Sequence, residues 1–218
     1  MDLRTALRTT GTVRGFTDRA VDPAVLYEVL DDARFAPSGG NKQPWRVAVV
    51  DDVSVRRSLA SAMRPVWEEY VATTMAGHRP FVMGRSLDGI EPTAVPNALI
   101  DDIESVPVVL AVAADLGQIA LMDGHLDRPA LTGGASVYPF CWNLLLSARA
   151  HGLGGVLTTF ASRREPEIAA TLALPENHAL AATIFLGYPV HQPTRLRRRP
   201  VDAFATRDRF DGEPFGRT

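Results

Sequence analysis

The sequence has little cysteine, few aromatic residues and almost no excess of charge of either sign. Its 218 residues include one cysteine, Cys141, so no intrachain disulfide can form and we expect a reducing, cytoplasmic setting. Cys141 lies in an apolar run, and we interpret it as a core residue rather than a catalytic thiol. The formal net charge of −2 gives no overall attraction to nucleic acid or to an anionic membrane surface.

Long hydrophobic runs are also missing. The longest, residues 106–114, is far shorter than the roughly 20 residues that are needed to cross a bilayer. The N-terminus carries acidic Asp2 and lacks the apolar stretch of a signal peptide. These features predict a soluble protein with no membrane partner, and the length predicts one domain over residues 1–218.

Signatures of a metal site or of a protein nucleophile are absent from the sequence. The histidines are scattered, with neither cysteine nor carboxylate at ligand spacing, so we predict no metal site. The sequence contains no G-x-S-x-G elbow, no Walker loop and no G-x-G-x-x-G after a strand. We therefore expect a bound cofactor to carry the chemistry.

The apolar residues that are present predict helices and strands in irregular order. Spacing of i, i+3 and i+4, with caps such as Asp22 and Gly152, predicts helices over residues 3–10, 23–36, 54–71, 135–151 and 165–172. Apolar and β-branched runs predict strands over residues 45–50, 106–114, 156–160 and 180–186. The order favours a mixed α/β or α+β sandwich over a regular doubly wound sheet.

Two segments show no sustained period. Residues 73–105 hold three prolines and three glycines, and we predict an irregular insertion that serves as a substrate lid or binding loop. Residues 188–218 form a polar C-terminal extension with a basic cluster at residues 195–199. A solvated tail and a contact to the phosphate of a cofactor remain open for that cluster. We predict no nucleic-acid partner, because the cluster has no interleaved aromatic residues and the chain is slightly acidic overall.

Three further segments hold residue types that suit a cofactor. Residues 10–16 combine threonine hydroxyls with Arg14, donors that suit a phosphate, although a solvated turn would have the same composition. Residues 33–46 place prolines and glycines beside amide side chains, which a plain turn does not require. In residues 152–160 a helix end explains Gly152, and we interpret the next two glycines as room for a flat ring.

Taken in order, these segments resemble the nitroreductase-like flavoproteins. The resemblance rests on TVRGFTDRAVDP, ARFAPSGGNKQPWRVAVV, ARAHGLGG and FLGYPVHQP, and it is most specific in the APSxxNxQPW-type segment. It extends over nearly the whole chain and is greatest to an actinobacterial branch of that family.

The resemblance implies an α+β fold, a three-layer sandwich in which helices flank a central, mostly antiparallel sheet. It also implies an intertwined homodimer with two FMN sites at its interface. The implied activity is ping-pong hydride transfer from NADH or NADPH to a small organic acceptor such as a nitroaromatic or a quinone. A same-fold enzyme with another reaction (dehalogenation, flavin fragmentation or dehydrogenation) and a non-catalytic flavin-binding protein remain alternatives.

The resemblance also nominates binding residues. The phosphate would be held by Thr10, Thr12, Arg14, Arg198 and Arg199. The ring or ribityl chain would contact Pro37, Ser38, Gly39 and Asn41, the first three from the other subunit, and Gly155, Thr158 and Thr159 would line the ring near its redox-active nitrogen. Many relatives have Arg and Ser where this chain has Thr10 and Thr12, so one positive charge is missing. Either Arg8 or the tail arginines supply it, or FMN binds more weakly to this chain.

Overall fold

A four-stranded antiparallel sheet forms the centre of the computed structural model, which describes residues 1–82 and 89–216. The strands are β1 Trp45–Val49, β2 Val108–Asp115, β3 Gly154–Thr158 and β4 His178–Gly187, in the spatial order β1-β2-β4-β3. Each neighbouring pair runs antiparallel, with a register shift in the β2–β4 pair. This arrangement confirms the predicted α+β class.

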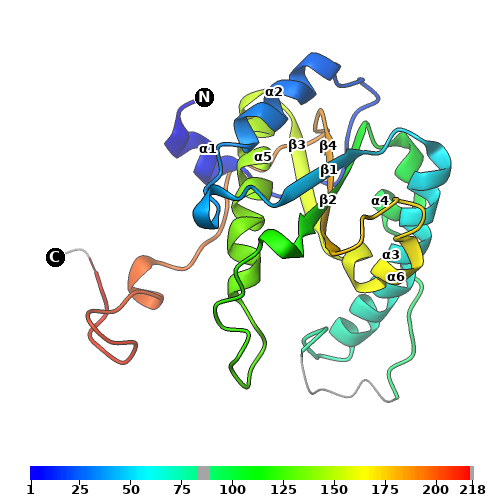
Figure 1. Ribbon diagram of the computed structural model, residues 1–218. Coiled ribbons are helices and arrows are strands. Elements are labelled where there is room, and N and C mark those ends of the chain that lie inside the picture. The colour runs from blue at the N-terminus through cyan, green and yellow to red at the C-terminus, as the bar shows by residue number, and fades with distance from the viewer. Residues whose placement is uncertain (83–88, 217–218) are drawn as a thin grey trace.

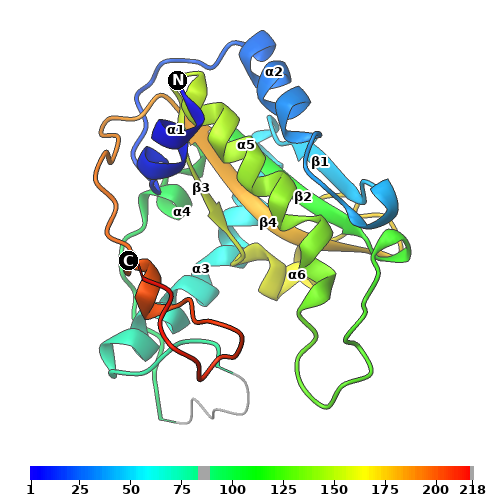
Figure 2. The same ribbon diagram turned by 90° about the vertical axis from the view of Figure 1, so that its left-hand side faces the viewer.

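Helices cover both faces of the sheet and give three layers (Figures 1 and 2). One layer contains α2 Pro23–Ala33 and α5 Tyr138–Ala150, with α1 Leu3–Thr9 packed on α5; the other contains α3 Val53–Met75, α4 Ala98–Asp101 and α6 Glu165–Ile168. Side chains alternate along a strand, so Leu110 and Val112 of β2 join the core on the α5 side while Val109 and Ala111 join the core on the α3 side. This double burial accounts for the continuous apolar run at residues 106–114, in which β2 begins at Val108.

Helix ends follow local capping. The Asp22 carboxylate accepts from the Ala24 backbone N–H at 2.8 Å and Pro23 occupies the first turn of α2, as predicted. Asp52 caps α3 in the same way, accepting from the N–H groups of Ser54 and Val55. The helix continues to Met75, beyond the predicted end at residue 71, because its last turns still bury residues such as Ala72 against the body.

The helix predicted over residues 135–151 ends within one residue of α5 but begins before α5 does. Gly152 has φ +81°, and the Leu153 N–H donates to the Ala148 carbonyl at 2.8 Å, which closes the helix with a left-handed glycine. At the other end a 3₁₀ turn, Thr132–Ser136, precedes α5, and Pro139 occupies the first turn of α5. The thiol of Cys141 is fully buried in this helix, and burial raises its pKa to about 12, which confirms a core residue.

The segment predicted to be irregular contains short helices. Its first residues complete α3, and α4 and a 3₁₀ turn, Ile103–Ser105, lie near its end; residues 83–88 of that prediction fall outside the described residues. The indole N–H of Trp67 donates to the Val95 carbonyl at 2.7 Å, which ties the segment to α3. Whether it serves as a lid stays a prediction.

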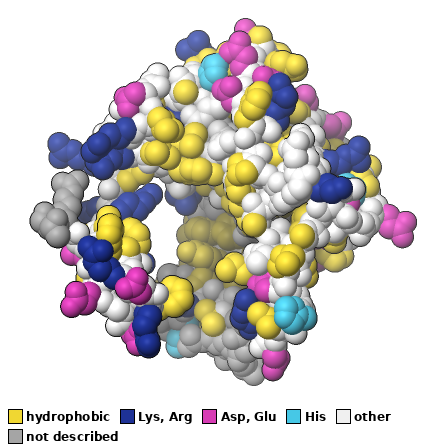
Figure 3. All heavy atoms as spheres, turned by 60° about the vertical axis from the view of Figure 1, so that its left-hand side comes forward, with side chains coloured by type: hydrophobic (Ala, Val, Ile, Leu, Met, Phe, Trp, Pro, Cys, Tyr) yellow, Lys and Arg dark blue, Asp and Glu magenta, His cyan; other side chains and the backbone are white. Residues whose placement is uncertain are grey.

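The C-terminal extension leaves the body after β4. It passes α1 and then runs away from the layers with one short 3₁₀ turn, Val201–Ala203 (Figures 1 and 2). Figure 3 shows Lys and Arg side chains beside the hollow that separates this extension from the body. No helix within the described ranges is both long enough and apolar enough to span a membrane.

Candidate functional site

Two cavities adjoin along β3, because Val156 and Leu157 line both of them. The first has a volume of about 350 Å³ and is lined by Thr10, Gly11, Thr12, Tyr138, Trp142, Leu145, Gly155 and Arg198 in addition to those two. The second has a volume of about 580 Å³ and is lined chiefly by Arg14, Met63, Trp67, Tyr70, Asn97, Leu99, Thr158, Thr159 and Phe160. Seven of the twelve predicted binding residues line one or the other of these cavities, the first on the α5 side of β3 and the second on the α3 side: Thr10, Thr12, Arg14, Gly155, Thr158, Thr159 and Arg198.

The first cavity is polar where the N-terminal segment and the C-terminal extension meet. The backbone at Thr12 bridges to Gly155, and the Val13 N–H donates to the Gly155 carbonyl at 2.9 Å, so the N-terminal segment is anchored on β3. The Thr10 hydroxyl donates to the Ala6 carbonyl at 2.7 Å, whereas the Thr12 side chain is exposed. Arg198 is the sole charged residue among the described residues that line this cavity. This composition suits a small anion.

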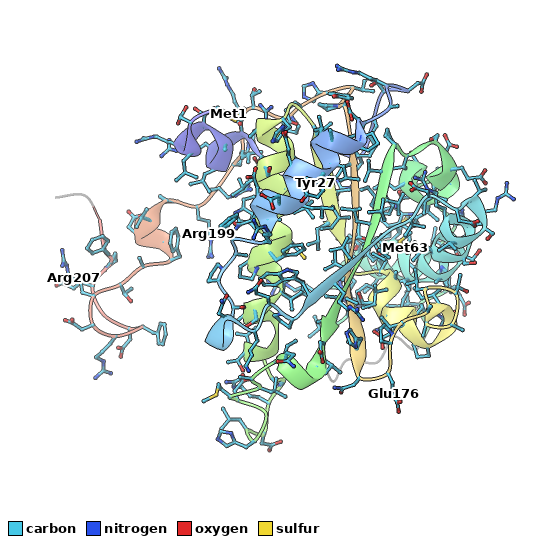
Figure 4. The ribbon with its side chains drawn as sticks, turned by 45° about the horizontal axis from the view of Figure 1, so that its top comes forward. Met1, Tyr27, Met63, Glu176, Arg199 and Arg207 are labelled. Atoms are coloured by element: carbon cyan, nitrogen blue, oxygen red, sulfur yellow. The ribbon has the colours of Figure 1, made fainter. Side chains whose placement is uncertain are left out.

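Arg14 and Arg199 are placed differently from the other predicted phosphate ligands. Arg14 is exposed and lines the second cavity. Arg199 is exposed on the tail, between the body and the outlying segment that carries Arg207 (Figure 4). The structure thus brings Arg198, and neither of these two, to the cavity that holds Thr10 and Thr12.

Packing inside the protein accounts for the paired glycines of β3. A Cβ at Gly154 would lie 2.7 Å from Val13 Cγ2, and one at Gly155 would lie 2.5 Å from Leu186 Cδ2. Both distances are shorter than a folded chain accepts, so neither position has room for a side chain. The interpretation that these glycines make room for a ring is therefore not needed to explain them, although Gly155 does line the first cavity.

The second cavity has an aromatic wall. The rings of Trp67 and Tyr70 stack with centroids 5.9 Å apart, and Phe160 is tilted against both. Trp67 is held in place by its bond to Val95. This wall was not among the predicted site residues, although an aromatic pair at i, i+3 on a predicted helix indicates that one helix face presents two rings together.

Thr158 contributes an unpaired hydroxyl to this cavity. Its Oγ1 is buried and has no hydrogen-bond partner among the described residues. A buried polar atom without a partner is costly, and a bound ligand with a polar edge would satisfy it. The opposite residue on β4, Thr183, also has an unpaired Oγ1, but it does not line the cavity.

The loop with the most specific sequence signal lines neither of these cavities. The Gly39 N–H donates to Ser136 Oγ at 3.0 Å, and Ser38 Oγ accepts from the Gln43 N–H at 2.9 Å. Asn41 has φ +55° and Gln43 has φ +49°, an uncommon conformation for residues with side chains and one that is often associated with function. Pro37, Gly39 and Asn41 are exposed. One chain alone does not bring this loop to the other predicted residues.

A larger cavity of about 870 Å³ lies on the other side of Tyr138 and contains none of the predicted residues. It is apolar and is lined by residues such as Leu116, Ile119, Leu121 and Leu131. Tyr138 and Trp142 of α5 remain 45% and 41% exposed, which is unusual for large aromatic side chains of a central helix.

Comparisons with known proteins point to one family. The family model described as the nitroreductase family matches residues 7–188. A curated relative named NADH dehydrogenase from Thermus thermophilus is 30% identical, over 93% of this chain and 94% of its own length. A Desulfovibrio desulfuricans protein solved in complex with FMN has a TM-score of 0.68 and 21% identity, covering 96% of this chain and 98% of its own. Iodotyrosine deiodinase bound to FMN and 3-iodo-L-tyrosine has a TM-score of 0.63 and 26% identity, covering 92% and 96%.

Proposed function

The chain belongs to the nitroreductase family, and on that premise we propose that it is a homodimeric, FMN-dependent oxidoreductase that uses NADH or NADPH to reduce a small organic acceptor. One observation carries the proposal. The two cavities share Val156 and Leu157 of β3; one of them offers hydroxyls and one arginine, and the other offers an aromatic wall. FMN has the same polarity along its length, with a phosphate at one end and a flat ring at the other.

The residues present fit FMN. Arg198 and the exposed Thr12 would hold the phosphate, since a guanidinium and a hydroxyl both donate to phosphate oxygens. The ring would lie toward the second cavity, where the unpaired Thr158 hydroxyl could bond its polar edge. Arg14 lines that cavity too, so we propose that its cation serves the ring end of the cofactor rather than the phosphate.

When bound, FMN supplies the hydride chemistry that the side chains of this protein cannot supply. The protein binds and orients the cofactor and excludes water from the ring. The aromatic wall of Trp67, Tyr70 and Phe160 offers a planar donor or acceptor a flat apolar surface. A charge-assisted bond from Arg14 would favour negative charge on the bound ring.

The loop at residues 37–41 completes the site from a second protomer. Support comes from its position, since it lines neither β3 cavity of its own chain, and from the exposed aromatic side chains Tyr138 and Trp142 of α5. Large exposed aromatic side chains are typical of surfaces that a partner covers. In the dimer, Pro37, Ser38 and Gly39 of one protomer would face the cofactor of the other.

The visible spectrum of the purified protein tests the proposal. The expected result is a flavin spectrum that bleaches anaerobically with NADH or NADPH and returns when a nitroaromatic or a quinone is added. A colourless protein that takes up no added FMN would overturn it. A coloured protein that neither nicotinamide reduces would be a flavin-binding protein without this activity.

Reductive dehalogenation is a second candidate, because a similar solved structure is an iodotyrosine deiodinase bound to a halogenated substrate. The two activities differ in a simple assay. If dehalogenation is the function, the reduced protein ignores nitro compounds and releases halide from a halogenated phenol.

A further inference from the structure

The C-terminal extension folds back along the N-terminal segment of its own chain. The Thr17 N–H donates to the Tyr188 carbonyl at 2.8 Å, and the Val190 N–H donates to the Gly15 carbonyl at 3.1 Å. Further along, the Gln192 side-chain amide donates to the Thr9 carbonyl at 3.2 Å. Figures 1 and 2 show the extension passing beside α1 in both views. These hydrogen bonds hold the C-terminal extension against the N-terminal segment, next to the first cavity.

Gly11 forms a notch at this junction, a gap in place of a Cβ into which the extension packs. A Cβ at this position would lie 2.8 Å from Leu196 Cδ2 and 3.0 Å from Pro193 Cβ. The φ of Gly11 is not among the positive values in the chain, so an alanine could adopt its backbone conformation. The reason for a glycine here is therefore contact with the extension and not a special turn.

Arg198 follows Leu196 by two residues and lines the first cavity beside Thr10 and Thr12. Thr10 brings no charge to this cavity, and its hydroxyl already donates to Ala6. Whatever positive charge the cavity offers to an anion therefore depends on where the extension places Arg198.

We infer that Gly11 is a positioning residue for the cofactor phosphate. It admits Leu196 and Pro193 to the surface of the N-terminal segment, and this contact holds Arg198 at the cavity, where it supplies the charge that Thr10 does not. The inference rests on the proposed binding of FMN. The contact between Arg198 and the phosphate then depends on the notch that Gly11 leaves between the N-terminal segment and the C-terminal extension.

Flavin affinity with and without the phosphate tests this inference. Apo protein is titrated with FMN and with riboflavin, and quenching of flavin fluorescence is measured. Arg198→Ala should lower FMN affinity by about tenfold to a hundredfold, the usual contribution of a charge-assisted bond, and Gly11→Ala should lower it by a smaller factor, because Leu196 Cδ2 is the end of a flexible side chain and the extension is displaced rather than removed. Both variants should change riboflavin affinity by less than about twofold. The double variant should lose little more than Arg198→Ala alone, because both changes act on one contact.

Matched controls exist in the same segments. A Cβ at Gly15 would meet nothing within 4 Å, so Gly15→Ala makes the same chemical change without touching the extension. Arg195→Ala removes an exposed tail arginine that does not line the cavity. Both controls should bind FMN as the unchanged protein does.

Limited trypsin digestion of the apo protein adds a readout that needs no flavin. Gly11→Ala should speed cleavage after Arg195 and Arg197, relative to Gly15→Ala, because the extension is no longer held. If Gly11→Ala binds FMN and resists trypsin like Gly15→Ala, or if it loses riboflavin as strongly as FMN, the inference is wrong while the proposed function stands. If the unchanged protein binds neither flavin, the proposed function fails and the phosphate role fails with it, and the digestion alone decides whether the notch holds the extension.

Discussion

The two ends of the proposed cofactor site are built from different kinds of structure. The second cavity takes its wall from α3 and β3, whose residues pack into the core on the α3 side. The first cavity takes Thr10, Thr12 and Arg198 from segments outside the sheet, joined by a few hydrogen bonds and by the Gly11 contact. Stability and phosphate binding should therefore depend on different residues of the same protein.

The largest expected effect is a loss of stability caused by a change in the sheet core. Leu110 of β2 is fully buried between the helices of the α2–α5 layer and its neighbouring strands. Leu110→Ala should lower the free energy of unfolding by about 2 to 5 kcal/mol, because it removes buried surface and leaves a cavity. Denaturant titration of the apo protein measures this.

The matched change in the extension is Leu196→Ala, which should cost far less stability and yet weaken FMN binding. Equal losses of stability from the two leucine variants would contradict the division between the sheet core and the joined chain ends.

Arg14 should give the next largest effect, on affinity rather than on folding. Its side chain is exposed and has no ion pair among the described residues. Arg14→Ala should lower FMN affinity by roughly tenfold to a hundredfold and leave the thermal unfolding of the apo protein nearly unchanged. Since Arg14 lines the ring end, riboflavin affinity should fall as well, in contrast to Arg198→Ala.

Arg57→Ala is the control for that experiment, because Arg57 lines neither cavity. It pairs with Glu104 at the surface, and exposed pairs contribute little to stability. A collapsed apo protein after Arg14→Ala would show that this arginine is structural. Unchanged flavin affinity would remove it from the site.

A smaller effect should come from the unpaired hydroxyl of Thr158. Thr158→Val keeps the shape and removes the buried Oγ1, so the apo protein should be no less stable. FMN affinity should fall by about twofold to tenfold, the usual contribution of one neutral hydrogen bond. Thr183→Val is a close control, because Thr183 is the cross-strand partner with an equally unpaired Oγ1 but lines no part of the cavity. Equal affinity losses in the two variants would show that the hydroxyl does not contact the cofactor.

The sequence predicted well what depends on neighbouring residues. Asp22, Pro23 and Gly152 act within one turn of chain, so the start of α2 and the end of α5 were predicted correctly, and the apolar run at residues 106–114 correctly predicted a strand. The start of α5 and the two-residue shift of β3 were missed. Those boundaries depend on the 3₁₀ turn before Pro139 and on pairing of Gly154 with Gly187.

The site residues were likewise predicted where a motif names them and missed where distant segments meet. The family motifs named residues that the structure gathers along β3, whereas the i, i+3 spacing of Trp67 and Tyr70 places two rings on one face of α3 without showing that this face lines the site. Nor did composition show that Gly11 faces Leu196, since those residues are distant in the chain and meet only when the two ends are joined. Close packing against Val13 and Leu186 accounts for the glycines of β3, and a contact of Gly155 with the ring stays a prediction.

Subunit complementation tests the central claim, a cofactor site built from two protomers, most directly. Arg14→Ala is combined in mixed dimers with a variant in which Ser38, Gly39 and Gly40 are replaced, and activity is assayed at an FMN concentration too low to load either variant as a homodimer. If residues 37–41 act on the partner's cofactor, one site of the mixed dimer collects both defects and the other site is intact, so nitroaromatic reduction by NADH or NADPH returns. No recovery from confirmed mixed dimers would show that both segments serve the same chain, and the two-protomer site would be wrong.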